Sequence, residues 1–292
     1  MRVGLFAPLI NPFHDRDYVA ALGRAAEERG FHSIWVGEHV VLFDQHASAY
    51  PYSADGQLPG RADNGMLEPF AALSFLAAAT ETIRLGTGIC LVPQRNPVYT
   101  AKSVATVDWL SGGRVDFGVG VGWLKEEFDA LGVPFERRGA RAREYLEVMR
   151  RLWCDEVSAF AGDFYTLPAC RHDPKPVQSP HPPIYFGGES DAALRRVADL
   201  GAGWHGFALT PSDAGARIRR LSEILDERGR GLRDIDVTVC AYNHPVDQAA
   251  LDAYAEAGVD QLTLLAVGRD VDRLTARLDR MATGLPRPAA AP

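Results

Sequence analysis

Three closely spaced glycines, Gly118, Gly120 and Gly122, follow a short apolar run in SGGRVDFGVGVGW, residues 111–123. A glycine-rich turn after a strand often binds phosphate, and G-x-G-x-x-G is its dinucleotide form. The third glycine of that pattern would stand where the chain has Trp123. A triphosphate loop is excluded too, because it needs Lys followed by Ser or Thr and the chain continues WLKE. These glycines therefore need another explanation.

Other chemistry-bearing residue types show no metal-site spacing. The four cysteines lack a C-x-x-C pair and the eight histidines lack an H-x-x-x-H pair, so we expect structural thiols and no metal. The net charge of -7 and the pI of about 5.6 argue against nucleic acid and anionic membranes as partners. No apolar run approaches the roughly 18 residues of a membrane span, and the N-terminal run is too short for a signal peptide. We therefore expect a cytoplasmic protein with a small-molecule partner.

Apolar runs alternate with amphipathic segments along the whole chain, which is typical of repeated β-α units around a parallel sheet. The runs predict eight strands, at 2–6, 33–36, 83–92, 115–119, 183–187, 204–207, 236–240 and 261–266. Helices are expected at 15–28, 68–80, from Asn96 onward, 141–153, 190–200, 213–228, 247–257 and 270–281. Eight such units favour an α/β fold of the (β/α)8 TIM-barrel type, in one domain over residues 1–292.

Two segments interrupt this alternation, one after the second strand and one after the fourth. Residues 44–65 form a long polar stretch rich in Tyr, Pro, Gly and Asp. Residues 154–182 include an expected hairpin near 160–165 and five prolines within 168–182. Both are predicted to be insertions, and long loops of this kind commonly surround a binding site.

Barrel enzymes place their chemistry at the carboxyl ends of the strands. In this sequence the ends of the eight predicted strands are residues 6–9, Glu38 and His39, 88–95, 118–123, 187–190, 207–208, 241–242 and 266–268. The candidate site is therefore expected where these segments meet.

Six segments together resemble a known family. They are WVGEHV (35–40), IRLGTGICLVPQRNPV (83–98), LSGGRVDFGVGVGW (110–123), FERRGAR (135–141), PKPVQ (174–178) and PPIYFGG (182–188). In this order they resemble the bacterial luciferase-like superfamily of flavin and deazaflavin oxidoreductases, most closely its actinobacterial deazaflavin-dependent branch. The resemblance covers roughly residues 1–210.

The resemblance implies a hydride transfer between coenzyme F420, a deazaflavin, and a small organic substrate. It implies a phosphate site at Gly187, Gly188 and Ser190, where backbone N–H groups and the helix dipole suit an anion. It implies a cis peptide between Gly88 and Ile89 behind the cofactor ring. Asn96 is expected to reach the cofactor or to cap its helix. The implied role of Gly118, Gly120 and Gly122 is to clear the approach of the flat ring.

The same resemblance implies catalytic roles for Glu38 and His39, with the imidazole donating a proton or orienting the substrate oxygen. Trp123 and Tyr50 are expected to wall the substrate pocket, and a homodimer is expected because the family commonly forms one. One alternative is an FMN-dependent monooxygenase that uses reduced flavin and O2. Others are a non-catalytic flavin-binding protein and, least favoured, a metal-dependent barrel hydrolase.

Overall fold

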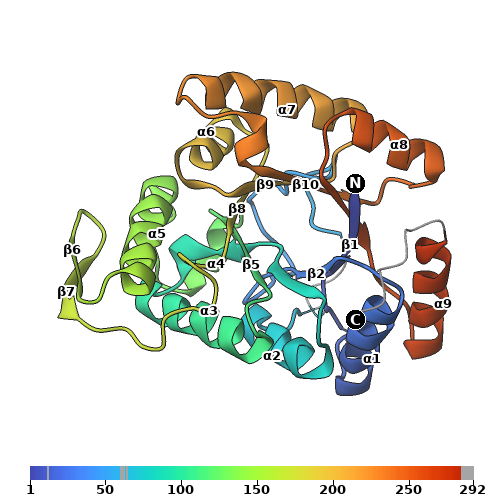
Figure 1. The fold of residues 1–292 in the computed structure, drawn as a ribbon, viewed down its shortest axis with the longest axis horizontal. Coiled ribbons are helices and arrows are strands. Elements are labelled where there is room, and N and C mark those ends of the chain that lie inside the picture. Colours follow the sequence, from blue (N-terminus) through green and yellow to red (C-terminus); the bar gives the residue numbers. More distant parts are fainter. Residues whose placement is uncertain (12, 60–62, 64, 284–292) are drawn as a thin grey trace.

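Within residues 1–11, 13–59, 63 and 65–283, which the computed structural model describes, the chain forms a closed barrel of eight parallel strands surrounded by helices (Figure 1). Neighbouring strands run in the order β3-β2-β1-β11-β10-β9-β8-β5, and the pairing of β3 with β5 closes the ring. The strands are β1 (Arg2–Ala7), β2 (Ser33–Val36), β3 (Arg84–Thr87), β5 (Val115–Gly120), β8 (Ile184–Gly187), β9 (Gly203–Phe207), β10 (Asp236–Tyr242) and β11 (Gln261–Leu265). The predicted TIM barrel is confirmed.

The third predicted strand is interrupted. Sequence patterning predicts one strand over 83–92, but the structure has β3 and a separate short strand β4 (Cys90–Leu91). Both parts pair with β5, so β4 continues the line of β3. The break falls at Gly88-Ile89, whose peptide bond is cis as expected from the family resemblance.

Helices lie outside the barrel and begin close to the predicted positions. They are α1 (Arg16–Glu28), α2 (Pro69–Ala79), α3 (Pro97–Ser111), α4 (Lys125–Ala130), α5 (Arg138–Cys154), α6 (Asp191–Leu200), α7 (Pro211–Asp226), α8 (Gln248–Glu256) and α9 (Val271–Ala282), with 3-10 turns at Val92–Gln94 and Leu232–Asp234. Side-chain caps explain the start points, since Asp15, Ser190 and Asp270 each accept a backbone N–H of their own first turn. The short helix α4 is absent from the prediction. None of the described helices is long and apolar enough to cross a membrane.

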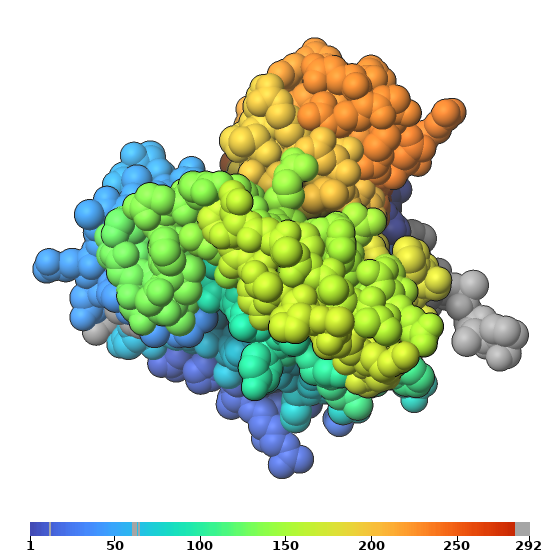
Figure 2. All heavy atoms as spheres, turned by 90° about the vertical axis from the view of Figure 1, so that its left-hand side faces the viewer, coloured from blue at the N-terminus to red at the C-terminus, as the bar shows by residue number. Residues whose placement is uncertain are grey.

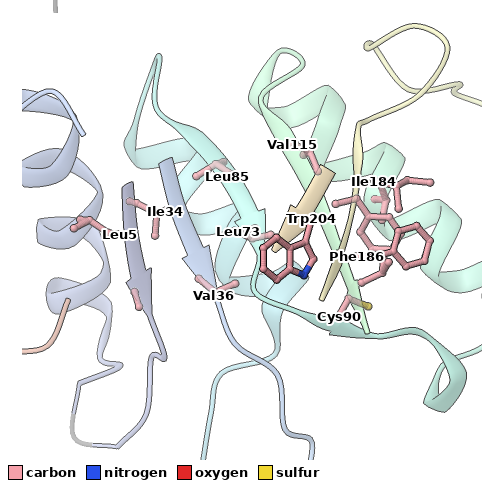
Figure 3. Close-up of a cluster of buried hydrophobic side chains, with 14 of the residues drawn as sticks. Leu5, Ile34, Val36, Leu73, Leu85, Cys90, Val115, Ile184, Phe186 and Trp204 are labelled. Carbon is pink, nitrogen blue, oxygen red and sulfur yellow. The ribbon is translucent and has the colours of Figure 1, made fainter. Parts of the chain in front are cut away.

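The core has an outer layer between strands and helices and a smaller cluster inside the barrel. Figure 3 shows part of the outer layer, in which Leu5, Ile34, Val36 and Leu85 are strand residues and Leu73 comes from α2. The inner cluster is made of Phe6, Trp35, Tyr185 and Cys240. The barrel is therefore filled below the strand ends.

Both predicted insertions are present. The hairpin β6 (Ser158–Ala161) and β7 (Thr166–Cys170) stands outside α5 in Figure 1. The other insertion follows β2; of its predicted span 44–65, residues 60–62 and 64 lie outside the described part. We call residues 44–59 the roof segment, because the segment contributes residues to the cavity at the strand ends.

A charged pair links β3 and β5 near their amino-terminal ends. The guanidinium of Arg84 donates to Asp116, with Nε 3.0 Å and 2.9 Å from the two carboxylate oxygens. Asp116 is 2% exposed. Burial raises the pKa of its carboxyl, while the hydrogen bonds from Arg84 oppose that rise. Removing either partner would leave a poorly solvated group without its counterpart.

We expect Asp116→Ala to destabilise the protein by about 2 kcal/mol, because Arg84 would lose its buried counter-charge. A thermal scan should show a fall in Tm of roughly 5 °C. The matched control is Asp129→Ala, since Asp129 forms an exposed pair with Lys125 and should contribute well under about 1 kcal/mol. Equal Tm values for the two variants would contradict this prediction.

Candidate active site

A cavity of about 550 Å³ opens at the carboxyl ends of the strands. Its wall includes the strand-end segments 37–39, 88–89, 120–123 and 187–190, together with Phe207 from β9. The structure thus brings residues from all eight predicted strand ends to one cavity. Among the described residues, no group of three or more His, Cys, Asp or Glu could hold a metal ion.

The imidazole of His39 is held from one side by a buried carboxylate. Its Nδ1 lies 3.2 Å from Oε2 of Glu127, which is fully buried on α4. An ionised carboxylate can only accept hydrogen bonds, so Nδ1 carries the hydrogen. The His39 side chain is 10% exposed and lines the cavity, which leaves Nε2 as the ring nitrogen for a ligand.

Glu127 also organises the backbone after β2. It accepts from the backbone N–H groups of Val40 at 2.6 Å and Val41 at 3.3 Å, and from Nε2 of Gln94 at 3.0 Å. Burial tends to raise the pKa of Glu127, but the hydrogen bonds from His39, Gln94 and Val40 outweigh burial and lower it. The carboxylate is therefore ionised at neutral pH and fixes both the ring and the chain that carries it.

Glu38 lines the cavity, yet both of its oxygens already have partners. The backbone N–H of Leu91 donates to Oε2 at 2.5 Å, and Nε of Arg95 donates to Oε1 at 2.6 Å. Arg95 also binds Glu68 at the start of α2. In this arrangement Glu38 ties β2 to β4 and is a positioning group. Of the two residues predicted to be catalytic, His39 is the one with an uncommitted polar atom at the cavity.

Gly120 of β5 and Gly187 of β8 make room for the side chain of Ile89. A Cβ added at Gly120 would lie 2.0 Å from Cδ1 of Ile89, and one added at Gly187 would lie 2.6 Å from the same atom. Gly88 and Ile89 themselves line the cavity. Gly120 and Gly187 therefore let the Gly88-Ile89 unit project inward as an apolar platform, and Gly120 and Gly122 themselves line the cavity.

Two of the predicted cofactor residues lie outside the cavity. A Cβ at Gly118 would stand 1.9 Å from the carbonyl oxygen of Thr87, so this glycine permits the close approach of β3 and β5. The side chain of Asn96 accepts from the N–H groups of Val98 and Tyr99 and caps α3. Asn96 thus has the capping role that was one of its two expected roles.

The turn between β8 and α6 forms another part of the wall. Gly187, Gly188 and Ser190 all line the cavity, as the phosphate prediction requires. Gly188 has a φ of 98°, which a side chain would disfavour. Ser190 caps α6 through Ala193, so the helix directs its positive dipole end toward this turn.

Two arginines stand beside this turn. Arg138 and Arg196 line the same cavity, and neither contacts a carboxylate among the described residues. Burial lowers the pKa of both, and Arg138 and Arg143 lower that of Arg196 further. Cations placed together without an anion favour binding of a negatively charged group.

Two carboxylates on barrel loops hold the roof segment in place. Glu126 accepts from the backbone N–H groups of Ala47 at 2.6 Å and Ser48 at 3.2 Å, and from the Ser48 hydroxyl at 2.7 Å. Glu189 accepts from the Tyr52 hydroxyl at 3.1 Å. In Figure 2 the blue atoms around residue 50 and the green atoms of the segment after β5 lie together at one end of the molecule. The roof segment is therefore anchored on both sides of the cavity.

The two residues predicted to wall a substrate pocket both line the cavity and touch each other. The rings of Trp123 and Tyr50 have centroids 5.2 Å apart at an angle of 63°. Trp123 also meets the imidazole of His39, with ring centroids 5.9 Å apart. Trp123 therefore contacts both the roof segment and the candidate catalytic ring.

Sequence reasoning missed four charged residues of this site, Glu126, Glu127, Arg138 and Arg196. The acidic pair that begins four residues after Gly122 was a usable signal, since that position belongs to a barrel loop. Arg138 lies within FERRGAR, which the resemblance included without a role. Arg196 is one of two arginines on α6 and gave no signal.

Sequence comparison agrees with this architecture. The uncharacterized protein Rv0953c of Mycobacterium tuberculosis is 36% identical over 270 residues, which cover 91% of this chain and 93% of that protein. The family model described as luciferase-like monooxygenase matches residues 1–286. The chain belongs to this family. It is thereby an oxidoreductase of the luciferase-like type.

Luciferase-like relatives carry names that refer to two different cofactors. The FMNH(2)-dependent dimethylsulfone monooxygenase of Pseudomonas putida is 33% identical over 194 residues, covering 65% of this chain and 48% of that enzyme. The coenzyme F420-dependent tetrahydromethanopterin reductase of Methanopyrus kandleri superposes with a TM-score of 0.72 over 94% of this chain and 96% of that one, at 20% identity. At that identity the match concerns the fold alone. Membership of the luciferase-like family does not decide between FMN and F420.

Glu127→Gln should reduce stability in a pH-dependent way. The folded-state pKa of Glu127 lies below its ordinary value of 4.5, so its contribution is complete above that pH and is lost as the pH falls through the folded-state pKa. The difference in Tm between the wild type and Glu127→Gln should be largest near neutral pH and should shrink below about pH 4.5.

Other carboxyl groups titrate in both proteins and cancel in this difference. Glu136→Gln is the control, because the Glu136 residue is exposed and its side chain has no hydrogen bond or ion pair in the described structure. A Tm difference for Glu127→Gln that is constant from neutral pH to pH 3.5 would show that the ionised carboxylate is not what stabilises this region.

Proposed function

We propose that this protein transfers a hydride between coenzyme F420 and a small organic substrate. The observation that carries the proposal is the meeting of three features in one cavity. These are the turn before α6 with Arg138 and Arg196 beside it, the apolar Gly88-Ile89 platform and the oriented imidazole of His39. A phosphate, a flat ring and a proton-transfer step are what such features serve.

The cavity residues fit a phosphate-bearing cofactor with a planar ring. Arg138, Arg196 and the first turn of α6 would hold the phosphate, because they supply positive charge that the described residues leave unneutralised. Gly88 and Ile89 would support the ring. When bound, the ring supplies the two-electron hydride chemistry.

His39 would act as the proton partner of the substrate. With Nδ1 held by Glu127, Nε2 can exchange a proton with a substrate oxygen as the hydride moves. Glu38 would hold β4, and with it the platform, in register with β2. The roof segment would keep bulk water from the reacting groups.

F420 is placed before FMN because WVGEHV has an acidic residue followed by histidine at the end of the second strand, as in the deazaflavin branch that it resembles. In a deazaflavin a carbon replaces N5 of the flavin ring, so the ring transfers hydride and reacts poorly with oxygen. An FMN-dependent monooxygenase is the second candidate, supported by the FMNH(2)-dependent relative. A non-catalytic flavin-binding protein would need the phosphate site but would have no use for the orientation of His39 by Glu127.

Titration of the apoprotein should separate the two cofactors. We expect F420 to bind with a dissociation constant in the low micromolar range and FMN to bind at least tenfold more weakly, followed by fluorescence. Arg196→Ala should weaken F420 binding by about tenfold or more, since a charge-assisted contact to phosphate is lost.

Arg233→Ala is the matched control, because the Arg233 side chain is 93% exposed and lies outside the cavity. Tighter binding of FMN than of F420 would favour the monooxygenase. If Arg196→Ala binds F420 as tightly as the wild type does, Arg196 does not hold the cofactor phosphate.

His39→Ala should leave cofactor affinity within a few-fold and lower turnover by about 100-fold, because proton transfer is lost while the phosphate site stays intact. Substrate-dependent oxidation of reduced F420 across a broad panel of small organic compounds is the measurement. His14→Ala, outside the cavity, is the control. An equal loss of affinity and turnover would assign His39 a structural role.

A further inference from the structure

We propose that the substrate of this enzyme is an uncharged, flat, ring-containing molecule with an oxygen that accepts a hydrogen bond, and that the hydroxyl of Tyr50 is its donor. The inference rests on the proposed function, which assigns the Gly88-Ile89 platform and the α6 turn to the cofactor. It concerns the remaining part of the same cavity, below the roof segment.

The shape of this part is set by aromatic rings in edge-on contact. Tyr50 meets Trp123 at 5.2 Å and Tyr52 at 5.5 Å, and Tyr52 meets Phe207 at 4.9 Å, with interplanar angles between 63° and 73°. Rings arranged in this way form a continuous aromatic wall. A flat unsaturated guest can pack against such a wall by edge-to-face or offset contacts, which add to simple burial of apolar surface.

The charge balance of this wall disfavours an ionic substrate. Glu189 lines the cavity, but it accepts from the N–H of Phe207 at 2.9 Å and from the Tyr52 hydroxyl. Glu38 is committed to Arg95 and Leu91. The described roof-side lining is otherwise apolar and consists of Leu42, Pro51, Leu58, Pro59 and Met66. A charged guest would lose hydration against this part of the lining, and its described residues supply no counter-ion apart from Arg138 and Arg196, which are assigned to the cofactor.

The hydroxyl of Tyr50 is a polar group of this wall that can serve a ligand. Tyr50 is 8% exposed and lines the cavity, and its hydroxyl forms no hydrogen bond with any described residue. Its neighbour Tyr52 differs, because its hydroxyl donates to Glu189. This hydroxyl is not among the fully buried polar atoms that lack a partner, so it is open to the cavity, where a ligand oxygen can accept its hydrogen bond.

The position of Tyr50 relative to His39 supports the same assignment. Trp123 contacts the rings of both residues, with centroid distances of 5.2 Å to Tyr50 and 5.9 Å to His39, so both rings belong to the same part of the cavity wall. Burial raises the pKa of Tyr50, which keeps the hydroxyl protonated and able to donate at working pH. Tyr50 is thus a specificity-determining residue for the substrate oxygen.

Binding of three probes tests the proposal. These are 1-tetralone, which is flat with a carbonyl oxygen, tetralin, which lacks the oxygen, and the anion 1-naphthoate. Dissociation constants are measured by calorimetry on wild type, Tyr50→Phe and Tyr99→Phe, with and without saturating F420 or FMN. Tyr99 is the matched control because it is 79% exposed on α3, outside the cavity.

We expect 1-tetralone to bind more tightly than tetralin and 1-naphthoate in the wild type. Tyr50→Phe should weaken the binding of 1-tetralone by about five- to tenfold and leave the binding of tetralin unchanged, whereas Tyr99→Phe should change neither affinity. Unchanged 1-tetralone affinity in Tyr50→Phe, tighter binding of 1-naphthoate, or no binding of 1-tetralone would overturn the proposal.

The cofactor titration keeps this test separate from that of the proposed function. Failure of both F420 and FMN to bind would remove the proposed function. If a cofactor binds normally but the three probes bind with equal affinity, only the proposed substrate class and the proposed role of Tyr50 would be wrong.

Discussion

A buried negative charge must be neutralised by its surroundings, and the carboxylate of Glu127 shows how much structure this requirement can organise. Its partners are a ring nitrogen of His39, two successive backbone N–H groups of Val40 and Val41, and the amide of Gln94. These groups come from the loop after β2 and the turn before α3, while Glu127 itself follows β5. One charge therefore sets the relative position of three barrel loops.

The same site is shaped by close packing as much as by charge. Gly118 allows two strands to approach, and Gly120 and Gly187 receive one isoleucine side chain. A larger residue at Gly120 or Gly187 would displace Ile89 and with it the platform. The glycine-rich turn thus shapes the cavity in two ways, by accommodating the Ile89 side chain and by lining the cavity with Gly120 and Gly122.

The sequence predicted the barrel, its insertions and most element boundaries because these depend on local periodicity, caps and prolines. It also predicted which strand ends meet, since barrel topology brings all carboxyl ends to one face. It did not predict that Glu38 would be engaged by Arg95, because that contact depends on how β4 turns after Gly88-Ile89. Arg196 illustrates the same limit, since nothing local distinguishes a helix arginine facing a cavity from one facing solvent.

The anchoring of the roof segment has a consequence for how such an enzyme can diversify. Glu126 holds the segment largely through backbone N–H groups of Ala47 and Ser48, which almost any amino acid supplies. The second anchor, Glu189, instead binds a side chain, the Tyr52 hydroxyl. The roof segment can therefore change its side chain at Ala47 and keep its attachment, whereas loss of the Tyr52 hydroxyl would release one side of the segment.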